Sequence, residues 1–153
     1  MMYLVKGFDH LRVGDRVSVT KTITSADAAL YAAATGDFGP VHFDDTYAQR
    51  TRFGERIAPG IMVGGIATSV LTSELVGVLG VSIEDRFRFT GAVRYGDTIT
   101  IDVWIAALDP EQQTVLWQAS ARNQKGEEVL QIEATVKFPR KRPAAGPSAP
   151  ASA

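Results

Sequence analysis

A long apolar run, IAPGIMVGGIATSVLTSELVGVLGV, occupies residues 57–81 and limits the possible folds. Glu74 is the one charged residue in it. A membrane-spanning helix needs roughly 20 consecutive apolar residues, and this run is interrupted by Pro59, by several glycines and by Glu74. A helix that is apolar on nearly all sides is instead buried inside a protein. We therefore predict a long buried helix that begins near Pro59. Its small residues, which would let another element approach closely, are Gly64, Gly65 and Ala67.

Segments with strand patterns supply the layer that would cover this helix. Residues 15–24 alternate apolar and polar side chains, and four later segments alternate or run apolar at strand length. Short turns separate these four, which predicts an antiparallel meander. Together with the first strand they predict an α+β fold, in which a curved antiparallel sheet of about five strands wraps around the long buried helix. The later segments are residues 81–90, 97–108, 113–123 and 127–138.

Two shorter helices are predicted between the first strand and the long helix. The first is alanine-rich, with Ser25 as its N-cap and Gly36 as its stop. The second lies within residues 45–53, capped by Asp44 or Asp45. Glycine and proline between these helices predict a connecting loop.

Length and composition exclude several classes of protein. The length of 153 residues predicts a single domain, over residues 1–138, that is large enough to bury a hydrophobic core. A net charge of −1 provides no positive field that would attract nucleic acid or an anionic membrane. The absence of cysteine excludes thiol catalysis and cysteine-based zinc sites, and the presence of only two histidines excludes a histidine-rich metal site. No signal peptide is evident, so a cytoplasmic location is expected.

The last stretch, residues 139–153, is rich in proline, alanine and serine and predicts a disordered tail. It contains a basic cluster, Arg140, Lys141 and Arg142. Aromatic residues do not interleave with this cluster, so a solvated tail is favoured over a nucleic-acid patch.

The connecting loop GDFGPVHFDD, residues 36–45, carries more chemistry than a connection needs. Asp37 and His42 lie five positions apart across a glycine–proline turn. A carboxylate and an imidazole that share one water molecule can act as an acid–base pair. The alternative is structural: Asp37 forms a simple Asx-turn, and His42 is an ordinary hydrogen-bonded loop histidine.

Gly60 adds a possible third component, because it lies at the start of the long helix. Backbone N–H groups are unpaired there and the helix dipole is positive. A carbonyl oxygen that gains negative charge during a reaction would be stabilised by such a group, as in an oxyanion hole. An acid–base pair and an oxyanion donor together suggest the addition or removal of water next to an activated carbonyl.

The segment from Tyr31 to Met62 resembles the signature of the MaoC-like dehydratases, the (R)-specific enoyl-CoA hydratases of the hot-dog fold. Further resemblance is found in LRVGD, in RFRFTGAVRYGDTIT and in ARNQKGEEVLQIEATV, so it extends to about Phe138. The family usually has Asn where this chain has Gly39, and His where it has Pro59. The matching positions are Thr35, Gly36, Asp37, Pro40, His42, Asp44, Tyr47, Ala48, Phe53, Ile57, Ala58 and Gly60.

The resemblance implies a hot-dog fold and reversible addition of water to a trans-2-enoyl-CoA thioester. It implies Asp37 and His42 as the catalytic pair and the Gly60 amide as oxyanion donor. It implies no metal and no cofactor, since CoA is part of the substrate. Thr68 is a candidate contact for the acyl chain, although a hydrogen bond back to its own helix is favoured. Candidate contacts for the CoA phosphates, which are equally explained as solvated side chains, are Arg86, Arg88 and Arg94.

Two alternative functions remain at this point. One is an acyl-CoA thioesterase on the same fold, and the other is a non-catalytic domain that binds acyl-CoA. All of these interpretations predict self-association, because the edges of a five-stranded sheet are normally covered. We expect a homodimer, with a higher oligomer as a further possibility.

Overall fold

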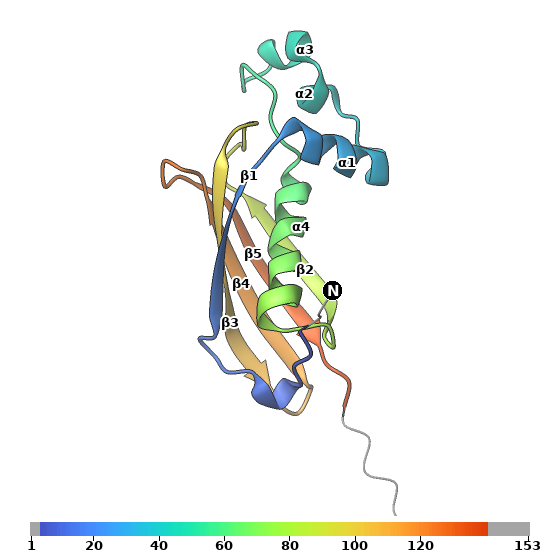
Figure 1. Ribbon diagram of the computed structural model, residues 1–153, viewed down its shortest axis with the longest axis vertical. Helices are drawn as coiled ribbons and strands as arrows, with labels where there is room; N and C mark the ends of the chain where they lie inside the picture. The colour runs from blue at the N-terminus through green and yellow to red at the C-terminus, as the bar shows by residue number, and fades with distance from the viewer. Residues whose placement is uncertain (1–3, 141–153) are drawn as a thin grey trace, which may run out of the picture.

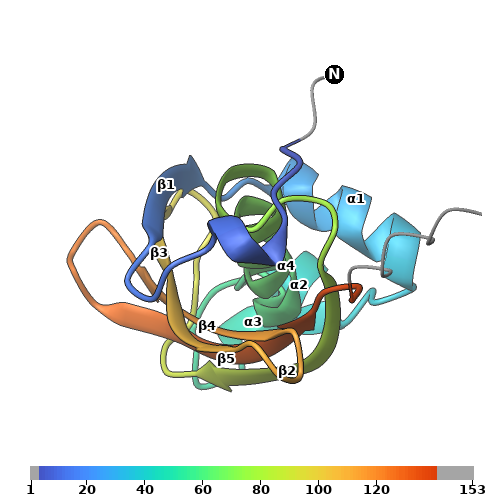
Figure 2. The ribbon, with the colours of Figure 1, turned by 90° about the horizontal axis from the view of Figure 1, so that it is seen from below.

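One antiparallel sheet of five strands curves around a helix that lies along its concave side (Figure 1 and Figure 2). The computed structural model describes residues 4–140. This arrangement confirms the predicted α+β fold. The predicted tail begins at residue 139, so nearly all of it lies outside the described residues. The strands are β1 (Arg16–Thr22), β2 (Val81–Phe89), β3 (Thr98–Asp109), β4 (Thr114–Arg122) and β5 (Glu128–Lys137).

The order of the strands in the sheet is β1-β3-β4-β5-β2, so only β3, β4 and β5 form a meander. The prediction that β2 and β3 are neighbours is wrong. The turn signal between them is real, because the Asp97 carboxylate accepts a hydrogen bond from the Arg94 N–H at 2.7 Å. However, the connection bridges to Ile57 and carries the chain from one edge of the sheet to the other side. A local turn signal shows where the chain bends and not which strands pair.

The central helix is shorter and more exposed than the sequence predicted. α4 (Gly60–Val70) continues into a π-helical turn, η2 (Leu71–Leu75), and the apolar run then enters β2 at Val81. Met62, Val63 and Ala67 are buried against the sheet. On the opposite side Ile61 is 48% exposed. The prediction of burial nearly all round is therefore wrong for the chain taken alone.

Glycines on α4 allow β2 to pack closely against it. A Cβ atom on Gly64 would lie 2.6 Å from Cε1 of Phe87, and one on Gly60 would lie 2.7 Å from Cε1 of Phe89. Both distances are too short for a side chain, so glycine is required for this packing. Gly65 has nothing within 4 Å of its Cβ position. The predicted close approach is confirmed for Gly64 and not for Gly65.

The core lies between α4 and the inner faces of the strands. β3 alternates buried and partly buried residues, which directs Ile99, Ile101, Val103 and Ile105 toward the helix. Trp117 of β4 is fully buried beside them. Burying one such side chain contributes about 1.5–3 kcal/mol, so this layer holds the helix and the sheet in fixed positions.

The N-cap of α1 (Ser25–Thr35) lies one residue earlier than predicted. Thr24, and not Ser25, is the N-cap: its hydroxyl accepts from the Asp27 N–H, and the Asp27 carboxylate accepts from the Thr24 N–H. This reciprocal pair is a capping box. Gly36 ends the helix with φ 79°, as predicted for a left-handed cap.

Two short helices lie beyond one end of the sheet, above the N-terminal end of α4 (Figure 1). α2 (Pro40–Phe43) is a single turn within the segment that was predicted to be a loop. α3 (Asp45–Gln49) confirms a helix capped by Asp44, although it ends earlier than residue 53. Near the N-terminus, η1 (Phe8–His10) is a short 3-10 turn. Within residues 4–140, no helix is both long and apolar enough to span a membrane.

Candidate active site

A cavity of about 620 Å³ opens where the N-terminal end of α4 meets the end of β2. Gly60, Ile61 and Val63 of α4 form one wall, and Phe89 with the residues that follow β2 forms another. Most of the lining is apolar. Among the described residues that line the cavity, the polar side chains are those of His42, Arg52 and Thr90.

The position of His42 at this cavity follows from the ends and caps of three short helical segments. Gly36 ends α1, and Pro40 then starts α2, where its fixed φ suits the first helical position. One turn later the chain leaves α2, because Asp44 caps α3 by accepting from the Tyr47 N–H at 3.0 Å. His42 is thus held on a short, rigid turn between two caps.

A hydrogen bond sets the protonation of the His42 ring. Nδ1 lies 2.7 Å from the carbonyl oxygen of Ile57. A carbonyl oxygen can only accept, so Nδ1 carries the proton and donates it. In the neutral ring Nε2 is then an acceptor, and no residue in the described part of the chain occupies it. The imidazole therefore offers a free basic nitrogen.

Asp37 and His42 flank the same empty position beside Gly39. A Cβ atom on Gly39 would lie 3.3 Å from Oδ1 of Asp37, 3.3 Å from Cδ2 of His42 and 3.8 Å from Nε2 of His42. The predicted proximity of the two side chains is therefore present. Oδ1 of Asp37 also accepts from the Gly39 N–H at 3.3 Å, which is the Asx-turn of the structural alternative. The same turn directs the carboxylate toward the imidazole, so the two interpretations are compatible.

Gly60 is the first residue of α4 and lines the cavity. Its N–H has no acceptor within the helix, because the first turn of a helix leaves these groups unpaired. The preceding chain is anchored by the Ala58 N–H, which donates to the Val93 carbonyl oxygen at 2.7 Å. Gly60, whose N–H the helix leaves unpaired, thus lines the same cavity as His42 on an anchored backbone.

The other residues singled out in the sequence lie elsewhere. Asp37 lies beside His42 across the Gly39 position but is not itself part of the cavity lining. The Thr68 hydroxyl donates to the Gly64 carbonyl oxygen at 3.2 Å, as favoured from sequence, and Thr68 also lies outside the lining. Arg86 and Arg88 line a different hollow, formed by strands β2, β3, β4 and β5. Arg94 forms an ion pair with Glu55.

Sequence reasoning missed three contributors to this site. The Ile57 carbonyl oxygen sets the His42 tautomer, Tyr95 donates from its hydroxyl to the His42 carbonyl oxygen at 2.9 Å, and Arg52 lines the cavity. A main-chain carbonyl has no sequence signature. Tyr95 lies far along the chain from the loop of Asp37 and His42, and Arg52 follows that loop without being one of the matching positions, so only the folded chain brings the two residues here.

No cluster of three or more His, Asp or Glu side chains that could hold a metal ion gathers within residues 4–140.

The fold and the site together define a hot-dog protein with a cavity at the N-terminal end of its central helix, lined by a histidine that has an aspartate beside it. The MaoC-like domain matches residues 12–125, and the chain belongs to this family. It is 34% identical to an (R)-specific enoyl-CoA hydratase of Rhodospirillum rubrum, over 86% of this chain and 91% of that protein. It is 37% identical to a 3-hydroxybutyryl-CoA dehydratase of Methylorubrum extorquens, over 88% and 85% of the two chains.

Comparison with solved structures also finds hydratases of this kind. An unliganded R-hydratase from Pseudomonas aeruginosa aligns with a TM-score of 0.79 and 32% identity, covering 87% of this chain and 85% of that one. An (R)-hydratase from A. caviae aligns with a TM-score of 0.79 and 28% identity, covering 85% and 98%. The predicted hot-dog fold and the resemblance to MaoC-like dehydratases are confirmed.

Proposed function

We propose that this protein is an (R)-specific enoyl-CoA hydratase, which adds water reversibly to a trans-2-enoyl-CoA and forms an (R)-3-hydroxyacyl-CoA. The observation that carries the proposal is the grouping of three residues at one cavity. His42, with its free Nε2, and Gly60, with its helix N–H, line the cavity, and the Asp37 carboxylate lies beside His42. The names of the relatives support the same reaction.

In the proposed reaction one water molecule is held between two acceptors. Nε2 of His42 accepts from one of its hydrogens, since Nδ1 already carries the ring proton. Asp37 accepts from the other and removes it as the water oxygen bonds to C3. The π electrons of the C2–C3 double bond move toward the thioester, whose oxygen gains charge beside the Gly60 N–H. The proton taken from the water then passes from the Asp37–His42 pair to C2, which restores the thioester, returns Asp37 to its carboxylate form and completes the addition of water.

The test is the loss of ultraviolet absorbance of the enoyl thioester when crotonyl-CoA is added. Asp37→Asn removes the base and keeps the shape, and we expect it to lower the rate by about 10²–10⁴-fold. Asp44→Asn is the matched control from the same segment. Asp44 serves as the N-cap of α3, and Asn caps a helix as well as Asp, so its rate should match that of the wild type.

The same assay separates the alternatives. Release of free thiol from crotonyl-CoA or a saturated acyl-CoA would identify a thioesterase. Saturable binding of acyl-CoA without turnover, for short and long chains alike, would identify a binding domain. Equal loss of rate in both Asp variants would show that Asp37 is not the base.

The proposal includes no metal and no cofactor besides the CoA carried by the substrate. Dialysis against a chelator should leave the hydration rate unchanged. A cytoplasmic location stays a prediction, which fractionation of the source cells would test.

We further propose that the protein is a homodimer in which a second copy covers β2 and the open side of α4. The free edge of β1 is polar, whereas β2 exposes large apolar side chains with only β5 as its partner in the sheet. Unprotected apolar edges are normally covered. The exposed apolar residues are Ile61 (48%), Val81 (66%), Ile83 (60%) and Phe89 (50%).

Light scattering at micromolar concentration tests this assembly. The expected mass is twice that of the chain, and Ile83→Lys should shift it toward the monomer. Val13→Lys, an exposed apolar residue outside the sheet, is the control that should leave the mass unchanged. A wild-type monomer would contradict the proposal.

A further inference from the structure

Arg52 is the only formally charged side chain among the described residues that line the cavity, apart from the titratable His42. It is solvent-exposed, so it marks the point where the cavity meets solvent. Its guanidinium lies 4.9 Å from the centre of the Phe53 ring, which also lines the cavity. A cation over an aromatic face is attracted to it, so Phe53 holds the charge at the mouth.

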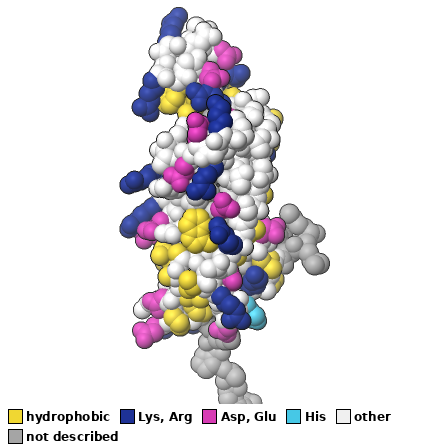
Figure 3. All heavy atoms as spheres, turned by 90° about the vertical axis from the view of Figure 1, so that its left-hand side faces the viewer, with side chains coloured by type: hydrophobic (Ala, Val, Ile, Leu, Met, Phe, Trp, Pro, Cys, Tyr) yellow, Lys and Arg dark blue, Asp and Glu magenta, His cyan; other side chains and the backbone are white. Residues whose placement is uncertain are grey.

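Unlike Arg56 and Arg94, Arg52 has no acidic partner within residues 4–140. Arg56 contacts Asp45 at 2.7 Å, and Arg94 pairs with Glu55. Figure 3 shows Lys and Arg side chains, with Asp and Glu among them, at the end of the molecule that carries α3. An unpaired guanidinium in such surroundings is available to an external anion.

The size and lining of the cavity indicate where that anion lies. A cavity of about 620 Å³ with mostly apolar walls suits an acyl chain and part of the arm that follows the thioester. The nucleotide end of CoA is highly charged and must stay in solvent, since burying its phosphates without partners would be costly. The exposed mouth, where Arg52 lies, is the place that this end of the substrate passes.

We propose that Arg52 binds an anionic group of the substrate at the mouth of the cavity, and that this group is a phosphate of CoA. The inference rests on the proposed function, because it assigns a specificity-determining residue to the same site. Guanidinium groups match phosphate oxygens in charge and geometry. This assignment replaces the three arginines considered from sequence, of which Arg86 and Arg94 are paired with carboxylates and Arg88 lines another hollow.

Kinetics with truncated substrates test the assignment. We expect Arg52→Ala to lower kcat/KM for crotonyl-CoA by about tenfold, the lower end of the range for a hydrogen bond to a charged group, with the loss in KM rather than kcat. Crotonyl-pantetheine lacks every phosphate, so wild type and Arg52→Ala should use it equally well. Crotonyl-3′-dephospho-CoA shows which phosphate is bound. If wild type and Arg52→Ala still differ in kcat/KM with this substrate, Arg52 binds the diphosphate and not the 3′-phosphate.

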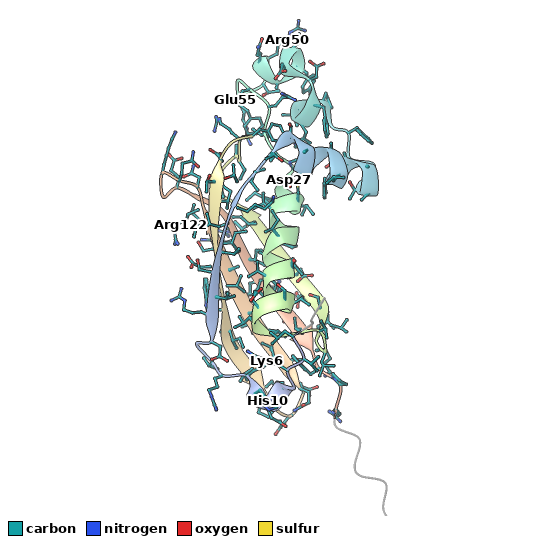
Figure 4. All side chains as sticks on the ribbon, viewed as in Figure 1. Lys6, His10, Asp27, Arg50, Glu55 and Arg122 are labelled. Atoms are coloured by element: carbon teal, nitrogen blue, oxygen red, sulfur yellow. The ribbon has the colours of Figure 1, made fainter. Side chains whose placement is uncertain are left out.

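Arg50→Ala is the matched control. Arg50 follows the same short helix, lies outside the cavity lining and is seen at the far tip of the molecule in Figure 4. The Arg50→Ala substitution removes the same charge from the same segment, and kcat/KM should stay at the wild-type value. A tenfold loss of kcat/KM in this variant would mean that the effect of Arg52→Ala is general electrostatic attraction, which would overturn the proposal. Arg52→Lys should keep part of the affinity.

Two other results decide the remaining cases. If Arg52→Ala matches wild type on crotonyl-CoA and loses rate only on an enoyl-CoA with a terminal carboxylate, the bound anion is that carboxylate and the phosphate assignment is overturned. If Arg52→Ala loses equally on crotonyl-pantetheine, its role is structural. Calorimetric binding of butyryl-CoA, which lacks the double bond, gives a readout without turnover, so failure of hydration and failure of phosphate binding remain distinguishable.

Discussion

The hydroxyl of Tyr95 donates a 2.9 Å hydrogen bond to the main-chain carbonyl oxygen of His42, across 53 positions of sequence. The ring of Tyr95 lies 5.5 Å from the guanidinium carbon of Arg56, measured to the ring centre. Tyr95 lies in the connection between β2 and β3, whereas His42 lies on α2 beyond the end of the sheet. This one bond ties the turn that carries the proposed catalytic histidine to the sheet.

Tyr95→Phe should therefore lower kcat for hydration about three- to tenfold, because a net hydrogen bond contributes about 0.5–1.5 kcal/mol and the His42 turn would lose its anchor. KM should change less than kcat. Tyr47→Phe is the control, since Tyr47 is an exposed residue of α3. An equal effect of the two changes on steady-state kinetics would exclude a positioning role for Tyr95.

Gly64→Ala should destabilise the protein by about 1–3 kcal/mol, the usual cost of overpacking, because its new methyl group would lie 2.6 Å from the Phe87 ring. Gly65→Ala on the same helix meets nothing within 4 Å. Helix propensity alone should make that variant about 0.5–1 kcal/mol more stable. Chemical denaturation at one protein concentration measures both, and similar values for the two would contradict the packing described for α4.

The cap of α1 distinguishes two neighbouring hydroxyl residues. Thr24→Ala should cost about 0.5–2 kcal/mol of stability, because it removes the side-chain half of the capping box. Ser25→Ala should be neutral or slightly stabilising, since Ser25 is already the first helical residue and Ala has the higher propensity. Thermal unfolding of the two variants would reveal any reversal of this order.

Asp27 should make the stability of the protein depend on acid pH. Hydrogen bonds from Lys21 and Thr24 hold the pKa of Asp27 below its ordinary value. A lowered pKa in the folded state means that the stabilisation is complete above the unfolded pKa and is lost as pH falls through the folded one. The difference in unfolding free energy between wild type and Asp27→Asn should therefore shrink from about pH 6 to about pH 2. A difference that stays constant over this range in denaturation experiments would contradict the assignment.

The boundaries of the strands were predictable from sequence because alternation of apolar and polar side chains is a local property. The segments predicted at residues 97–108 and 113–123 correspond to β3 (Thr98–Asp109) and β4 (Thr114–Arg122). The proximity of Asp37 and His42 was also predictable, since a glycine–proline turn between residues five apart leaves few arrangements. The stop at Gly36 follows from the freedom of glycine to adopt positive φ.

The pairing of β2 with β5 was decided only by the tertiary structure, because strand pairing depends on where the chain returns and not on local pattern. The same holds for the Tyr95 hydroxyl on the His42 carbonyl, for the Ile57 carbonyl that sets the histidine tautomer, and for the position of Arg52 at the cavity mouth. Local sequence patterns therefore specify most of the helices and strands and the chemistry of one turn. The folded chain decided which distant groups surround that turn, since long-range contacts form only when a shared core brings their segments together.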